Sequence, residues 1–154
     1  AYIYLSMSAY YLSLNLPGFA NWMHVQAQEE MVHVMKFFTF INDRGGRVLL
    51  QAVAAPETAW PAPSAPFAVA LEHERKVTAR IDNLVNLAID ERDHATNTFL
   101  QWFVTEQVEE ESNAEAVLRH LQLIGEDRSG LFMLDRELAA RVFTPPPTTG
   151  KGAA

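Results

Sequence analysis

The stretch QAQEEMVHVMKFF, residues 26–38, places a carboxylate and an imidazole where a helix usually buries apolar side chains. At 3.6 residues per turn, Glu30 falls within an apolar face, and His33 follows it by three positions on the neighbouring row. That face consists of Met23, Ala27, Glu30, Val34, Phe37 and Ile41. Because a buried carboxylate is costly unless it is compensated, the pattern predicts a basic side chain or a metal ion opposite Glu30.

Two later helical patterns also carry polar interruptions in their apolar faces. The first face consists of Phe67, Leu71, Glu74, Thr78, Ile81, Val85 and Ala88. The second consists of Leu100, Phe103, Gln107, Glu110, Ala114, Val117 and Leu121, and Glu106 borders it. Any single glutamate in such a face could be a boundary residue that reaches solvent or pairs with Lys or Arg. Three interruptions at similar depths, with no basic residue at those levels, favour a metal site.

The types of ligand indicate which metal such a site would hold. Oxygen donors with a single imidazole suit iron or manganese better than zinc or copper(I). The Glu-x-x-His spacing of Glu30 and His33 is the one that di-iron carboxylate proteins use to point both side chains into a helical bundle. The sequence therefore predicts a carboxylate-rich site for iron or manganese.

The elements that would position these residues are five predicted helices. They cover residues 1 to about 14, about 18 to 44, about 65 to 91, about 94 to 124, and 131–142. Ser64 is the expected N-cap of the third helix, with Pro66 in its first turn. The segment RVLLQAVAAPETAWPAPSAP contains four prolines, so it cannot be helical throughout. A link this long predicts a crossover along a bundle.

The expected fold class is therefore all-α, a four-helix bundle with a long crossover between the second and third helices and a short fifth helix. We expect one domain over residues 1–143 and a flexible Pro/Gly-rich tail over residues 144–154.

Composition narrows the function classes further. The chain has 154 residues, 49% of them hydrophobic, which is enough for a substantial core. Its formal charge of −7 argues against nucleic-acid binding and suits a protein that handles cations. The absence of cysteine excludes disulfides and thiol-ligated metals. No apolar run reaches the length of roughly 18 residues that spans a bilayer, so we expect no membrane partner. The absence of cysteine is compatible with the cytoplasmic location that we expect.

Four segments together resemble the non-haem bacterial ferritins: EEMVHVMKFF, LEHERKVT, FLQWFVTEQVEEE and LFMLDRELAARV. The likeness runs in order from Ala1 to about Val142. It implies a di-iron ferroxidase centre whose ligands and nearby tyrosine are Glu30, His33, Glu74, Gln107 and Tyr4. It also implies an additional iron site formed by Glu29, Glu106, Glu109 and Glu110.

The same resemblance implies an iron-storage enzyme that oxidises Fe(II) with dioxygen or hydrogen peroxide. Its copies would assemble into a hollow shell of 24 subunits, with the fifth helix lining a fourfold channel. The family's first-helix glutamate would lie four positions before Ala1, and we expect residues upstream of Ala1 to have been omitted. Haem is not expected, although Met31 matches the axial haem methionine of the bacterioferritins. Those proteins carry a second Glu-x-x-His, whereas this chain has EQVEEE.

Two alternatives remain open at the level of sequence. The chain could be a shell protein of the same fold that binds metal without competent oxidation. It could also be a helical partner-binding module whose buried acids meet basic residues of a second protein.

Overall fold

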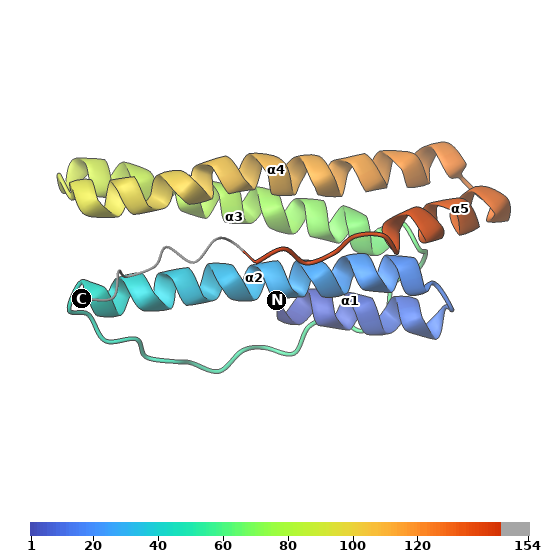
Figure 1. Ribbon diagram of the computed structural model, residues 1–154, viewed down its shortest axis with the longest axis horizontal. Helices are drawn as coiled ribbons and strands as arrows, with labels where there is room; N and C mark the ends of the chain where they lie inside the picture. Colours follow the sequence, from blue (N-terminus) through green and yellow to red (C-terminus); the bar gives the residue numbers. More distant parts are fainter. Residues whose placement is uncertain (146–154) are drawn as a thin grey trace. The chain divides into compact units, whose positions relative to one another are not determined.

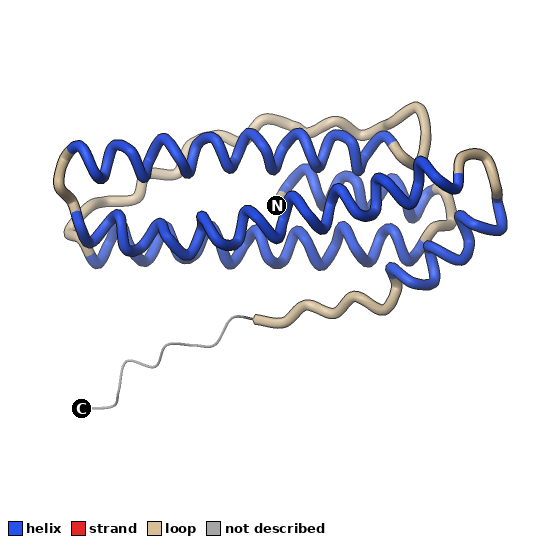
Figure 2. Tube along the Cα trace, turned by 90° about the horizontal axis from the view of Figure 1, so that it is seen from above, coloured by secondary structure: helices blue, strands red, loops and turns tan. Residues whose placement is uncertain are grey.

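The computed structural model describes residues 1–145, which form five α-helices and no strand (Figures 1 and 2). The helices are α1 (Tyr2–Ser13), α2 (Pro17–Asp43), α3 (Ala65–Asp90), α4 (His94–Ile124) and α5 (Arg128–Leu138). The all-α prediction is confirmed, and the first four helices lie close to their predicted bounds. Within the described residues, every helix is too short or too polar to cross a membrane.

The predicted bounds of the fifth helix are wrong at both ends. The helix starts at Arg128 because the Asp127 carboxylate accepts hydrogen bonds from the backbone N–H groups of Ser129 and Gly130, at 3.0 and 3.1 Å. It ends at Leu138, so residues 139–145 are not helical. Most of the predicted flexible tail, residues 146–154, lies outside the described residues.

The chain divides into two compact units, each built on a helical hairpin. The first comprises residues 1–59 together with the described residues from Phe132 onward, and it contains the α1–α2 hairpin. The second comprises residues 60–131 and contains the α3–α4 hairpin. Figure 1 shows α1 beside α2 and α3 beside α4.

The first hairpin turns tightly through Asn15, whose φ of 59° is in the left-handed region that asparagine tolerates. Its core consists of fully buried side chains: Tyr4, Met7, Tyr11, Phe19 and Met23. The rings of Tyr11 and Phe19 stack with centroids 5.1 Å apart. Burial raises the pKa of the Tyr11 hydroxyl, so this tyrosine stays neutral.

The predicted crossover is confirmed as a non-helical link between α2 and α3, over residues 44–64. Figure 1 shows its first part leaving the end of α2 and running back along the α1–α2 hairpin. The Ser6 hydroxyl donates a hydrogen bond to the carbonyl oxygen of Glu57 at 2.5 Å, which ties the link to α1. Pro66 occupies the first turn of α3 as predicted, but the Ser64 side chain makes no capping bond.

The apolar face predicted for α4 is confirmed, because all seven of its residues are buried. On α3, five of the seven are buried and Thr78 and Val85 are half-buried. The face predicted for α2 is wrong beyond Glu30, because Val34 is 51% and Ile41 is 39% exposed.

Asp93 caps α4, and its replacement should weaken the start of that helix. Its carboxylate accepts hydrogen bonds from the Thr96 backbone N–H at 3.0 Å and from the Thr96 hydroxyl at 2.7 Å. Asp93→Ala should therefore lower the free energy of unfolding by about 1 kcal/mol. Asp90→Ala is the matched control in denaturant titrations, because exposed Asp90 is the last residue of α3 and caps no helix. An equal loss in both variants would contradict the capping role.

Candidate metal centre

The first unit brings Glu30 and His33 together on α2. The Nδ1 atom of His33 lies 3.8 Å from the Oε2 atom of Glu30, and the side chains are only 10% and 13% exposed. Two ligand atoms that each lie about 2.1 Å from one ion can be at most about 4.2 Å apart, so this pair fits a single metal ion. The Glu-x-x-His spacing thus gives the geometry that the sequence predicted.

The second unit brings Glu74 of α3 together with Gln107 of α4. Both are buried, at 1% and 2% exposure. The Gln107 amide Nε2 donates to Oε2 and to the backbone oxygen of Glu74, both at 3.2 Å, and to the Thr78 hydroxyl at 3.4 Å. Because these acceptors use the amide nitrogen, Gln107 would bind a metal through Oε1. Burying the Glu74 carboxylate is costly, and the Gln107 hydrogen bond offsets part of that cost.

The other predicted site residues lie on the expected helices but differ in exposure. Tyr4 is fully buried in α1. On α4, Glu110 is buried, Glu106 is half-buried and Glu109 is exposed. Near these acids on α4, Trp102, which is not one of the predicted ligands, is half-buried and packs its ring edge-on against that of Phe103 with centroids 4.8 Å apart. Glu109, as an exposed side chain, is the predicted ligand with the least shielding from solvent.

Glu29 has a partner that the sequence did not indicate. The Arg141 guanidinium, from the segment after α5, pairs with the Glu29 carboxylate at 2.5 Å. Arg141 lies 112 residues further along the chain, so no local periodicity could have linked the two. The same is true of Asp135 on α5, whose carboxylate accepts hydrogen bonds from Gly18 and Phe19 at the start of α2.

Sequence reasoning also missed a cavity of about 410 Å³ between α3 and α4. Thr78 and Gln107 line it, together with the acids Asp82, Glu111 and Glu115. The Thr78 hydroxyl donates to Glu111 at 2.5 Å, and the Arg75 guanidinium lies 3.8 Å from the same carboxylate. Glu111 is therefore held by contacts within the α3–α4 hairpin.

Comparison with known proteins identifies the family. The family model for the ferritin-like domain matches residues 1–124. The chain belongs to the ferritin-like family. It is 41% identical over 143 residues to a bacterial non-heme ferritin of Staphylococcus aureus, covering 93% of this chain and 86% of that protein. The corresponding Staphylococcus epidermidis protein is 42% identical over the same share of each chain.

Solved ferritin structures agree with these relatives. A form of the Archaeoglobus fulgidus ferritin engineered to be closed is 53% identical, with a TM-score of 0.91 over 93% of this chain and 87% of that one. The open-pore ferritin of the same archaeon is 52% identical, with a TM-score of 0.91 over 92% and 87% of the two chains. The predicted fold class is therefore confirmed, and family membership supports iron storage as the function.

Proposed function

We propose that this ferritin oxidises Fe(II) to Fe(III) at a di-iron ferroxidase centre within each subunit and stores the ferric product as a mineral. Glu30, His33, Glu74 and Gln107 would supply the ligands, and Tyr4 would act beside them. The observation that carries the proposal is the Glu30–His33 pair, 3.8 Å apart and largely shielded from water on α2. Family membership supports iron as the ion that this pair takes.

The ligand types account for the direction of the reaction. Carboxylates are hard anionic ligands and stabilise ferric more than ferrous iron, so a carboxylate-rich centre favours oxidation. Each of two ferrous ions gives up one electron, and the pair of electrons reduces one dioxygen to hydrogen peroxide, or one peroxide to water, with uptake of two protons. The neutral amide of Gln107 is a weaker donor than a carboxylate, which would let the ferric product leave for storage.

Assembly into a shell of 24 copies belongs to the same proposal. The first unit exposes a row of apolar side chains on α2, at steps of three and four residues: Met31, Val34, Met35, Phe38 and Ile41. A contiguous apolar face of this kind is unusual on a monomer and marks an interaction surface, which supports self-association. We further propose one domain over residues 1–143, a fifth helix that lines a channel, no bound haem, and a cytoplasmic location.

Iron binding by the wild-type protein tests the proposal directly. Anaerobic titration with Fe(II) should show two strongly bound ions per subunit, and addition of dioxygen should convert both to Fe(III). Size-exclusion chromatography with light scattering should give the mass of 24 subunits. Binding without oxidation would favour the alternative, a metal-binding shell protein that lacks competent ferroxidase activity. Monomers that bind no iron would contradict both and favour a helical partner-binding module.

A further inference from the structure

In the segment that follows α5, Arg141 makes four contacts with α2. The Arg141 guanidinium pairs with Glu29 through Nη2 at 2.5 Å, and its Nη1 donates to the Gln26 side-chain oxygen at 2.9 Å. Nη1 also donates to the backbone oxygen of Trp22 at 3.3 Å, and the guanidinium carbon lies 4.4 Å from the centre of the Trp22 ring. This arrangement satisfies the planar donor fork of arginine and adds a cation–π contact.

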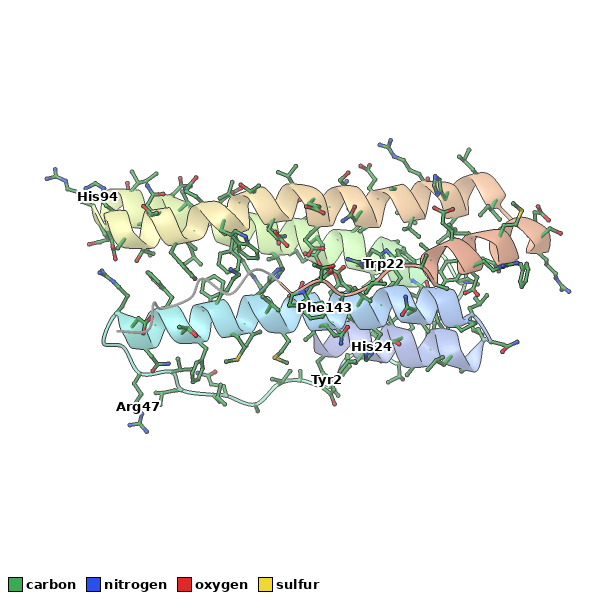
Figure 3. The ribbon with its side chains drawn as sticks, viewed as in Figure 1. Tyr2, Trp22, His24, Arg47, His94 and Phe143 are labelled. Carbon is green, nitrogen blue, oxygen red and sulfur yellow. The ribbon has the colours of Figure 1, made fainter. Side chains whose placement is uncertain are left out.

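Asn21, a further residue of α2, also binds this segment. The Asn21 side-chain amide donates to the backbone oxygens of Leu138, Ala139 and Arg141, at 3.3, 3.4 and 2.9 Å. Figure 3 labels Trp22 on α2 and Phe143 in the segment beyond α5. Residues 139–141, which we call the strap, are thus anchored to α2 by both their backbone and the Arg141 side chain.

The strap is relevant to metal binding because Arg141 attaches it to Glu29, a predicted iron ligand. The ferritin resemblance assigns Glu29 to an additional iron site, yet here its carboxylate pairs with a guanidinium, and the two side chains are only 24% and 20% exposed. A metal ion on the same carboxylate would lie close to the guanidinium, and the repulsion of like charges is weakly screened in a half-buried place.

We propose that Arg141 is a positioning residue that withholds Glu29 from the additional iron site. While the strap is in place, each subunit then binds only the two ions of the ferroxidase centre. Release of the strap would free the Glu29 carboxylate and admit a third ion. This inference rests on the proposed ferroxidase function for the first two ions, but the role of Arg141 is separately testable.

Counting bound ions tests the role of Arg141. In anaerobic calorimetric titrations with Fe(II), the wild type should bind two ions per subunit and Arg141→Gln should bind three. Arg136→Gln is the matched control, because it removes the same charge from an exposed position on α5 and should bind two. Glu29→Gln in the wild-type background should also leave the count at two, whereas adding it to Arg141→Gln should return three to two.

Amide hydrogen exchange gives a readout without metal. Arg141→Gln should speed exchange in residues 139–141, while helix content and subunit mass stay those of the wild type. Three ions in the wild type, a loss of one ion in Glu29→Gln alone, or no gain in Arg141→Gln would each overturn the inference and leave the ferroxidase proposal intact. A wild type that binds no Fe(II) would refute the ferroxidase proposal and the inference with it.

Discussion

Replacing Glu30 with alanine should lower the initial rate of Fe(II) oxidation by at least about tenfold. Loss of a residue that merely supports a metal ligand costs about 10–100-fold in affinity or activity, so loss of a direct ligand should cost no less. The Glu30 carboxylate lies 3.8 Å from His33, so its removal takes one anionic donor away from the imidazole. Stopped-flow absorbance at saturating dioxygen, with a fixed ratio of Fe(II) to subunit, measures the rate.

Glu72→Ala is the matched control for this substitution. It deletes the same carboxylate from an exposed position on α3, where Glu72 forms an ion pair with Lys76 at 2.7 Å. The hydrogen bond with Lys76 lowers the pKa of the Glu72 carboxyl. Because exposed ion pairs contribute little to stability, removing this one should leave the protein folded as before. Oxidation by Glu72→Ala should match the wild type. Equal rates in wild type and Glu30→Ala would remove Glu30 from the catalytic centre.

Helical periodicity correctly predicted the buried residues of those helices that bury only one face. On α4 the face from Leu100 to Leu121 was predicted completely, including the two polar positions Gln107 and Glu110. The same reasoning placed Glu74 in the core of α3. The reasoning works on α3 and α4 because each of these helices has a single apolar face, so the 3.6-residue period identifies its buried residues without ambiguity.

On α2 the predicted face keeps the helical period but is wrong beyond Glu30, because burial is not continuous along this helix. Apolar residues occupy two faces of this helix: one contains buried Met23 and Ala27, and the other contains exposed Met31 and Met35. Val34 lies seven residues, about two turns, beyond Ala27 and so on the same face, yet it is exposed, because the buried residues of α2 end at Ala27 except for His33. His33, which is buried, lies in register with buried Gln26 and Trp22, seven and eleven residues before it. A helix that is apolar on two sides signals a second contact, here proposed to be another subunit.

The long-range partners of the polar residues on α2 could not be predicted from the sequence for a different reason. Asp135 and Arg141 act on α2 across more than a hundred positions of sequence, and no periodic pattern encodes such a pairing. Sequence reasoning instead assigned both Asp135 and Arg141 to one continuous helix over residues 131–142. The helix in fact ends at Leu138. The Asn21 amide binds the backbone that follows, and the Arg141 side chain binds Gln26, so this segment is held on α2.

Gly18→Ala should destabilise the first unit by about 3 kcal/mol, although alanine is the better helix former. A Cβ atom at Gly18 would lie 1.6 Å from the backbone oxygen of Asp135, so α5 would have to move away. The Asp135 carboxylate would then lose the Gly18 and Phe19 backbone N–H groups, which it holds at 2.8 and 3.0 Å. Hydrogen bonds to a charged group contribute about 1.5–3 kcal/mol each. Calorimetry should show the melting temperature falling by about 6–12 °C.

Gly130→Ala separates this clash from the general effect of adding a methyl group to a helix. A Cβ atom there would meet the ends of the Ile124 and Asp127 side chains at 3.1–3.2 Å, and these can shift, so the melting temperature should change by no more than about 3 °C. Asp135→Ala should destabilise about as much as Gly18→Ala, and the double variant should lose little more than either, because both substitutions break the same contact. Additive losses, or a Gly18→Ala variant more stable than wild type, would show that α5 is not held by the start of α2.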